Sequence, residues 1–405
     1  MTANGDGAVA GAAARIGRYR WVVCGLLFAA TAINYIDRQM ISVLKPTLST
    51  ELGWSETDYA NIVFWFQTAY AIGYLGFGKV VDAIGARFGL GIGESGNFPG
   101  GVKAVTDWFP AKERALAIGI FNAGANVGAI CTPLLLWAMV PLMGWRMTFV
   151  VTGIFGVVWL VAWLVMYRDR PRDHPRVGAA EAAHIEQDPA DPPVVIERLW
   201  VKLLGKRETW AYALGKFFID PIWWFYLFWL PGYLGKQYNL NLLSWDTPQA
   251  AIAIALIYLI SDVGSVAGGW LSSAMLKAGA TPNRARKLTM LVCAFCVLPV
   301  MFATMVGNLW ISVVIIGVAA AAHQAFSANL YTVPSDTFPR YAVGSVIGIG
   351  GTAGAIGGMI FSKYAGYVLD AIGSYTPLFV VAGGAYFLAL LSIHLLSPRL
   401  ARTEI

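Results

Sequence analysis

Ionisable side chains within long apolar stretches are the first candidates for chemistry in this sequence. Asp37 and Arg38 lie in the middle of the apolar stretch 21–43. Charged groups are costly inside a membrane and are therefore functional candidates. An arginine holds a carboxylate through two parallel hydrogen bonds, and a carboxyl group can take up a proton. Arg38 is thus a candidate anchor for an organic anion and Asp37 for a proton. The alternative is a neutralising pair with a structural role only.

Glu94 is a second candidate for proton binding. It stands in a glycine-rich stretch with Gly91, Gly93 and Gly96, where neighbouring backbones can approach closely. Burial favours the protonated form of a carboxyl group, and a proton-coupling site must gain and lose a proton. The alternative interpretation is a structural hydrogen bond to a neighbouring helix.

Trp223 and Trp224 offer flat apolar surfaces on which a sugar ring can stack. Tyr70, Asn122 and Asn126 could supply hydroxyl and amide partners from the opposite side. One charged anchor, aromatic rings and several neutral hydrogen-bonding groups suit a polyhydroxy carboxylate. The alternative is that the tryptophans belong to the aromatic belt at the membrane surface.

The elements that must position these residues are membrane-spanning helices. The chain has 405 residues, of which 57% are hydrophobic and only 13% are charged, against about a quarter charged in soluble domains. Apolar stretches of roughly twenty residues, enough to cross a bilayer core of about 30 Å, recur along the chain. The fold class is therefore an all-α integral membrane protein. We predict eleven spans, at residues 21–43, 60–81, 88–108, 115–137, 147–167, 210–233, 250–275, 288–305, 309–333, 344–369 and 378–396.

Composition also excludes several classes of protein. The net charge of +6 arises from Lys and Arg in short loops, where such residues set membrane topology, so it does not indicate nucleic-acid binding. The four cysteines fall within apolar stretches and lack the spacing of a disulfide framework or a metal site. We expect no metal and no cofactor, and we expect a monomer surrounded by membrane lipid.

Residues 168–208 form the one long polar stretch and divide the chain into two halves. Eight Lys and Arg residues flank acids and prolines there, which predicts a flexible linker on the cytoplasmic side. The predicted domains are a tail (1–20), an N-terminal helical bundle (21–167), the linker (168–208), a C-terminal helical bundle (209–397) and a second tail (398–405). Both tails are expected in the cytoplasm and both bundles in the inner (plasma) membrane.

The two halves repeat one another. Asp107-Trp-Phe-Pro110, Gly119 and Gly128 match Asp336-Thr-Phe-Pro339, Gly348 and Gly357, all at one offset of 229 residues (336 − 107). Two parallel halves joined by a cytoplasmic linker are the plan of a transporter that rocks about a site at their interface.

The offset gives Glu94 a counterpart in the second half, because 94 + 229 = 323 and residue 323 is a histidine. We therefore expect His323 and the neighbouring Gln324 to face the central site and bind substrate; the alternative is a histidine that only packs. Lys216 and Asp220, four residues apart, can pair on one face of a helix as a structural contact.

Several strings resemble one family of transporters. Residues 34–38, 91–99, 107–110 and 220–231 are similar to those of the anion:cation symporter family of the major facilitator superfamily, and most closely of its hexuronate transporters. The resemblance covers nearly the whole chain. It implies two pseudo-symmetric helical bundles, a sugar-acid anion as substrate, and proton coupling through the acid at position 94. Tyr35 and Asn97 lie in these strings, and we count them among the substrate-binding residues.

Gly78, Asp82, Gly85 and Arg87 resemble the Gly…Asp…Gly…Arg motif that gates the cytoplasmic side in that superfamily. The matching loop of the second half departs from the pattern, with Ser273 where aspartate is usual.

The loop charges indicate that one helix is missing. With the N-terminus inside, Arg87 lies inside after two spans, and only one span separates it from Lys112 and Arg114. If that span crosses, these residues and the linker lie outside, against the positive-inside rule that every later loop obeys. The family has twelve helices and we count eleven, so the third is missing, near residues 85–88. We predict that 88–108 satisfies the charges only as a re-entrant segment, and that the chain transports poorly.

The leading interpretation is a secondary transporter, a proton-coupled symporter of a small organic anion such as a hexuronate or another sugar acid, working by alternating access. A transport-defective, truncated permease is the main alternative. A membrane-embedded enzyme is a third hypothesis, and no Ser/His/Asp set or phosphate-binding loop favours it.

Overall fold

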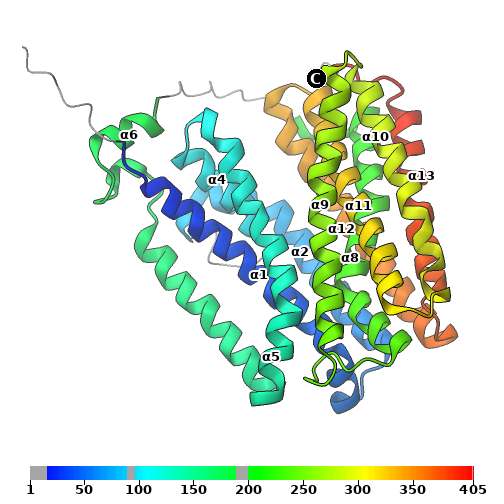
Figure 1. Cartoon of the computed structure of the whole chain (residues 1–405). Coiled ribbons are helices and arrows are strands. Elements are labelled where there is room, and N and C mark those ends of the chain that lie inside the picture. Colours follow the sequence, from blue (N-terminus) through cyan, green and yellow to red (C-terminus); the bar gives the residue numbers. More distant parts are fainter. Residues whose placement is uncertain (1–15, 89–95, 188–198, 404) are drawn as a thin grey trace, which may run out of the picture.

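The protein is a bundle of long helices. The computed structural model describes residues 16–88, 96–187, 199–403 and 405, with side chains except at 74–84, 99, 111, 115 and 340. No strand occurs within these ranges (Figure 1), so the predicted all-α fold is confirmed. The first half contains α1 (Tyr19–Leu52), α2 (Glu56–Ile84), α4 (Asn97–Trp108) and α5 (Ala111–Met166). Between the halves lie η2 (Pro171–Asp173), α6 (Ala179–Ile185) and α7 (Leu199–Leu204). The second half contains α8 (Arg207–Tyr238), α9 (Pro248–Lys277), α10 (Pro282–Val297), η3 (Leu298–Met305), α11 (Leu309–Thr337), α12 (Arg340–Ile372) and α13 (Thr376–Leu396).

The two ends of the bundle differ. The C-terminus and α6 lie at one end, which we call the linker face (Figure 1). The opposite end is the distal face. Seven of the described helices are long and apolar enough to cross a membrane. One of them, α5, turns back at Gly144, whose φ of 76° is a backbone conformation that favours glycine. Its two arms, residues 111–143 and 145–166, correspond to two predicted spans.

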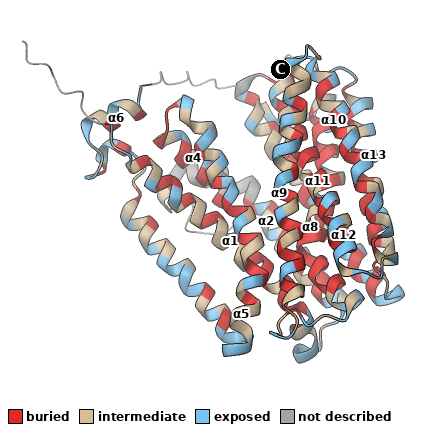
Figure 2. Cartoon of the chain, viewed as in Figure 1, coloured by how far each residue is buried: buried red, intermediate tan, exposed pale blue. Residues whose placement is uncertain are grey.

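The second half packs around α8, which Figure 2 shows as mostly buried. Close approach of α12 to α8 depends on a glycine. A Cβ atom at Gly354 would lie 2.1 Å from Oδ2 of Asp220, so any larger residue there would displace that carboxylate. In the first half, a Cβ atom at Gly124 of α5 would lie 2.3 Å from the carbonyl oxygen of Phe28 in α1. Small residues thus bring helices together in both halves, as is usual in membranes.

The second arm of α5 has few neighbours. In the most apolar part of α5, 11% of residues are buried, against 33–56% in the other six apolar helices. Val157, Val158, Val161 and Val165 are all more than half exposed. One exposed face is expected for a helix that meets lipid, but burial this low means that little protein covers the other sides. This exposure agrees with a missing neighbouring helix.

Both flanks of the segment predicted as span 88–108 lie at the linker face. The Arg87 amide donates to Oδ1 of Asp169 at 3.0 Å, and Nε1 of Trp108 donates to the carbonyl oxygen of Arg168 at 2.9 Å. Since Asp169 and Arg168 follow the end of α5 directly, the chain returns to the face from which it leaves. The charges on the flanking loops require this arrangement.

The helix within this segment is shorter than predicted. It begins at Asn97, and its 12 residues reach about 18 Å, too little to cross a core of about 30 Å. Nδ2 of Asn97 donates to Oγ1 of Thr31 at 3.1 Å, and Thr31 stands twelve residues (31 − 19) from the linker-face end of α1. The described part of α4 therefore runs from mid-depth to the linker face, whereas residues 89–95 lie outside the described ranges.

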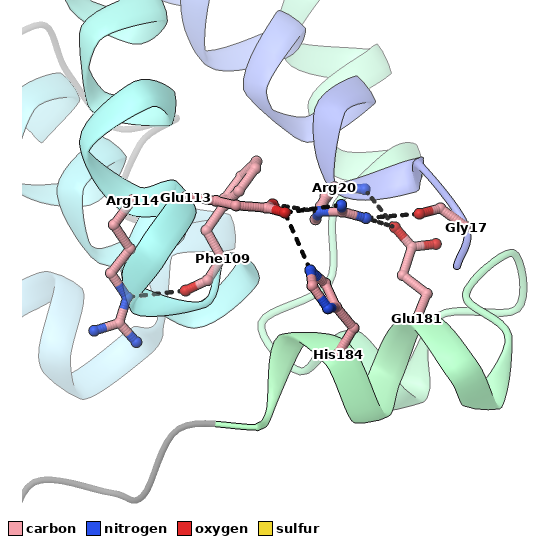
Figure 3. Close-up of polar contacts among 7 residues, drawn as sticks. All are labelled: Gly17, Arg20, Phe109, Glu113, Arg114, Glu181 and His184. Carbon is pink, nitrogen blue, oxygen red and sulfur yellow. Dashed lines mark hydrogen bonds and ion pairs between the residues drawn. The ribbon is translucent and has the colours of Figure 1, made fainter. Parts of the chain in front are cut away.

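Residues 168–187 are folded onto the first half, so the prediction of a flexible linker is wrong for this part. Arg20 at the start of α1 joins two acids (Figure 3). Its Nε donates to Oε2 of Glu113 at 2.7 Å, and its Nη1 donates to Oε1 of Glu181 in α6 at 3.3 Å. Nε2 of His184 lies 3.1 Å from Oε1 of Glu113. The composition of this segment suggested flexibility because composition shows that acidic residues are present but does not show which basic side chains they pair with.

Loss of the Glu113 charge is expected to release α6. The hydrogen bond from Arg20 holds the pKa of Glu113 below its ordinary value of 4.5. Because this pKa is depressed, the ion pair stabilises the docked linker above pH 4.5, and the stabilisation is lost as the pH falls through the lower folded pKa. A charge-assisted hydrogen bond contributes about 1.5–3 kcal/mol, so Glu113→Gln should speed amide exchange in α6 at pH 7 roughly tenfold or more.

Glu186→Gln serves as the control, since Glu186 pairs with Arg172 at the exposed surface, where ion pairs contribute about 1 kcal/mol or less. Equal exchange rates in α6 for the two variants would contradict this account of the linker.

Candidate functional site

Arg38 lies at the boundary between the halves, enclosed by aromatic rings. Its guanidinium carbon is 4.7 Å from the ring centre of Tyr35, 5.7 Å from Phe66, 5.0 Å from Tyr70 and 5.1 Å from Trp224. The first three belong to α1 and α2, whereas Trp224 comes from α8. Aromatic faces stabilise a cation by about 0.5–2 kcal/mol each and contact the flat side of the guanidinium, so they do not compete with in-plane hydrogen bonds. The cage therefore holds a positive charge where an anion could reach both halves.

Several site residues lie at one depth. Arg38, Tyr70, Trp224 and His323 each stand fourteen residues from the distal end of their helix (52 − 38, 70 − 56, 238 − 224 and 323 − 309). At 1.5 Å per residue this depth is about 21 Å. We call this set the Arg38 layer. Sequence analysis had selected all four residues, and the structure brings them to a common level from four helices.

His323 lies beneath Trp223 within the second half. Its ring stacks on that of Trp223, with centres 5.2 Å apart and planes at 11°, and Nδ1 lies 2.7 Å from the hydroxyl oxygen of Tyr386. The side chain is buried and does not face lipid. Trp223 also meets the ring of Tyr258. His323 thus fixes the orientation of Trp223, while Trp224 points toward Arg38.

Lys216 and Asp220 form the pair that their spacing predicts, with Nζ 2.8 Å from Oδ1. Nζ also donates to the hydroxyl of Tyr331 on α11 at 3.0 Å. The pair is largely buried and lies toward the linker face from the Arg38 layer, because it precedes Trp224 on α8. These contacts join α8 to α11 within one half, as a structural pair would.

The remaining predicted residues differ in exposure. Asp37 is exposed, whereas Arg38 beside it is buried, so the two side chains face different surroundings. Asn97 is buried, and its Oδ1 has no hydrogen-bond partner within the described ranges. Asn122 is exposed and Asn126 half-buried on α5, and Gln324 is half-buried on α11. Glu94 lies outside the described residues.

The predicted gate motif anchors the end of α2 to the end of α5. Gly85 has a φ of 82°, and a Cβ atom there would lie 2.7 Å from the Asp169 carboxylate. Nη2 and Nε of Arg87 donate to the carbonyl oxygen of Leu164 at 2.6 and 3.2 Å. A cation is favoured at the C-terminus of a helix, so Arg87 stabilises this junction at the linker face. The surroundings of Gly78 and the side chain of Asp82 lie outside what the structure describes.

Hydrogen bonds join the halves on the distal side of the Arg38 layer. These bonds join Ser42 to Leu227 and Phe228, Tyr59 to Phe228, Glu56 and Thr57 to Asp370, Asn61 to Lys363, Gln67 to Ser362, and Trp137 to Ser244. Toward the linker face, α1 leans away from α9 (Figure 1). The layer is therefore closed from the distal face.

Three residues of this region were not among those predicted from the sequence. Phe66 completes the cage around Arg38, and the fully buried Gln67 accepts a hydrogen bond from Ser362 of the other half. Asp262 lies halfway along α9. The signal for Asp262 was available, because it is an acid within the predicted span 250–275. Gln67 also gave a signal, as an amide within the predicted span 60–81, whereas Phe66 gave none, since a phenylalanine is ordinary in such a helix.

A family model and similar curated relatives all indicate the same family of membrane transporters. Residues 83–362 match the model of the Major Facilitator Superfamily. The chain is 28% identical to the hexuronate transporter of Escherichia coli K12 over 89% of this chain and 90% of that protein. It is 31% identical to a probable L-galactonate transporter of the same strain, over 70% of this chain and 68% of that protein. It is also 28% identical to a probable galactarate/D-glucarate transporter of Bacillus subtilis, over 93% and 91%. The predicted resemblance to hexuronate transporters is confirmed.

Solved structures share the fold. A D-xylose-proton symporter matches with a TM-score of 0.66 and 15% identity, over 93% of this chain and 97% of that chain. A bacterial homolog of the human lysosomal transporter Spinster, in an inward-facing and occupied conformation, matches with a TM-score of 0.63 and 18% identity, over 94% and 95%. The family match excludes the hypothesis of a membrane-embedded enzyme. The chain belongs to the major facilitator superfamily and is a multi-pass membrane transporter.

Proposed function

We propose that this protein is a proton-coupled symporter of a small organic anion, a hexuronate or a related sugar acid. The observation that carries the proposal is the arginine cage. A buried guanidinium surrounded by four rings, one of them from the opposite half, suits a ligand that has one carboxylate and an apolar ring face. The names of the relatives, transporters of hexuronate, L-galactonate and galactarate or D-glucarate, support the same substrate class.

Each group in the Arg38 layer has a role in this proposal. Arg38 holds the substrate carboxylate, and Trp224 and Tyr70 pack against the sugar ring. Tyr35, Asn97, Asn122, Asn126 and Gln324 supply neutral hydrogen bonds to hydroxyl groups. Trp223, supported by His323, forms the wall on the side of the second half. A substrate bound to both halves stabilises the intermediate in which they close around it, as alternating access requires.

Proton coupling is assigned to Glu94 and Asp37. Both are acids in the first half, and Asp37 neighbours the proposed anion anchor along α1. The linker face is proposed to lie in the cytoplasm, because the basic loops gather there, and the inner membrane is the proposed location. The exposed second arm of α5 favours the alternative of a truncated permease with impaired transport.

Glu94→Gln is expected to abolish accumulation of D-glucuronate driven by a pH gradient in proteoliposomes, while exchange of labelled for unlabelled substrate continues. A glutamine keeps the size and hydrogen bonding of the side chain but cannot carry a proton. Accumulation and exchange are measured in the same vesicles, so loss of protein affects both and loss of coupling affects only the first. Glu186→Gln, on the surface, is the control. Undiminished accumulation by Glu94→Gln would remove Glu94 from the coupling mechanism.

A further inference from the structure

Asp262 is the acid of the second half that the proposed function leaves unused. It lies fourteen residues from the distal end of α9 (262 − 248), the same depth as the Arg38 layer. The carboxyl group is half-buried. Within the described ranges it has no hydrogen-bond or ion-pair partner. An ionisable group at mid-depth is costly unless it has a function, and no structural partner accounts for this one.

The face of α9 that carries Asp262 is buried on the distal side of that residue. Residues 251, 255, 258 and 262 follow one another at helical spacings of four and three. Ala251, Ala255 and Tyr258 are buried. A different, exposed side of α9 carries Val263 and Trp270, which are 65% and 70% exposed, and Val266, one turn after Asp262 on its own face, is 75% exposed. Asp262 therefore lies on the buried face, at the point where burial decreases toward the linker face.

The neighbours of this face belong to the transport site. Tyr258, one turn before Asp262, donates a hydrogen bond to the carbonyl oxygen of Tyr226 and meets the ring of Trp223. Ser261 and Gly264 face α11, and α5 of the first half also packs against α9. Asp262 thus lies beside the wall that Trp223 forms, at the boundary with the first half.

The other charged groups on the helices around α9 have partners of their own. On α8, Lys216 pairs with Asp220, and on α11 His323 contacts Tyr386. On α10, Arg286 contacts Asp336 and Ser272 near the linker face, and Lys287 donates to carbonyl oxygens after α13. The first arm of α5 has no Asp, Glu, Lys, Arg or His after Arg114. Among the described residues, the charges at or next to the Arg38 layer are therefore Arg38, Asp37 beside it on α1, and Asp262.

We propose that Asp262 is a further proton-binding carboxyl group of the transport site, in addition to Glu94 and Asp37, and that it must be protonated when the anion is bound. This inference rests on the proposed function. An ionised carboxyl group at the depth of the bound anion repels it, and repulsion between like charges is strong where water is scarce. When a proton from water neutralises Asp262, the repulsion ends, and the carboxyl O–H can donate a hydrogen bond to the substrate.

The test compares D-glucuronate binding by the purified full-length chain between pH 5.5 and 8. In the wild type, affinity should fall as the pH rises, because the anion binds together with protons. Asp262→Asn is permanently neutral, so the slope of its log Kd against pH should be smaller than that of the wild type by up to one proton. Between pH 5.5 and pH 8 the wild type should therefore lose roughly tenfold or more in affinity beyond what Asp262→Asn loses. Asp246→Asn, in the exposed loop before the same helix, is the matched control and should behave as the wild type.

A second variant distinguishes the loss of a titrating group from the loss of folding. Asp262→Glu keeps a titrating carboxyl group and should keep the full pH slope even if Asp262→Asn is unstable. An unchanged slope in Asp262→Asn, or loss of the slope in Asp262→Glu, overturns the role of Asp262. Failure of the wild type to bind any sugar acid at any pH instead overturns the proposed function, so the two failures are distinguishable.

Discussion

Replacement of Arg38 with alanine is expected to weaken binding of D-glucuronate by roughly 30- to 4,000-fold. The range follows from the cost of removing one partner of a buried, hydrogen-bonded charge pair, about 2–5 kcal/mol. The variant leaves the rings of Tyr35, Tyr70 and Trp224 without the cation that they surround, but it removes no contact between the halves other than those of Arg38 itself. Isothermal titration of the purified full-length chain measures the effect directly.

Two further variants separate the roles of charge and shape. Arg38→Lys keeps the positive charge but loses the two-pronged geometry, so we expect an affinity between those of the wild type and Arg38→Ala. Arg146→Ala is the control: Arg146 pairs with Glu51 on the exposed distal surface and should leave the Kd unchanged. If Arg38→Ala binds D-glucuronate as tightly as the wild type, the carboxylate is held elsewhere.

Insertion of an apolar helix of about thirty residues with its turns after Gly85 is expected to raise uptake at least tenfold. The loop charges demand an even number of crossings between Asp82 and Lys112, and the described part of α4 is too short to provide one crossing. The exposed second arm of α5 offers a surface against which the inserted helix can pack. Initial rates in proteoliposomes, corrected for the amount of inserted protein, compare the two chains.

The control for this insertion has the same length but a polar, glycine- and serine-rich sequence, which can add no crossing. Equal uptake by the chain as it stands and by the chain with the apolar helix would show that eleven spans are sufficient. The topology argument would then fail, while the assignment of Arg38 would remain open to the binding test.

The sequence predicts the membrane fold well, because twenty-residue apolar stretches have few structural solutions in a bilayer. It also selects Arg38, Tyr70, Trp224 and His323, which share one depth in the structure. Their selection depended on chemical type: a charge or a polar group in an apolar helix stands out. Phe66 could not be selected in this way, since only its contact with Arg38 gives it a role. Gln67 is a polar residue that could have been selected, but only the packing of α2 against α12 shows that it meets the other half.

The structured part of the linker shows what cannot be predicted from one sequence, namely contacts between residues far apart in the chain. Prolines and acids between 168 and 208 indicate a mobile chain, yet Glu181 and His184 meet Arg20 and Glu113 of the first half. Such long-range pairs depend on which faces of α1 and α5 lie side by side, and one sequence does not contain that information. The span predicted from Phe88 fails for a related reason. Hydropathy measures whether residues 88–108 tolerate lipid, but the direction of the chain depends on its anchors at Asp169 and Arg168.

The contact between Asp370 and α2 has a consequence for the resting state of the protein. Asp370 accepts hydrogen bonds from the Glu56 and Thr57 amides at 3.1 and 2.8 Å, and the side-chain hydrogen bond from Thr57 holds its pKa below the ordinary value. The second half thus adds to the capping of α2, whose own Ser55 accepts a hydrogen bond from the Asp58 amide at 3.0 Å. In the proposed transport cycle, opening of the distal face breaks the bonds to Asp370, and loss of a helix cap costs about 1 kcal/mol. The contact therefore favours a shut distal face, and in the proposed cycle the free energy of substrate binding must offset its loss.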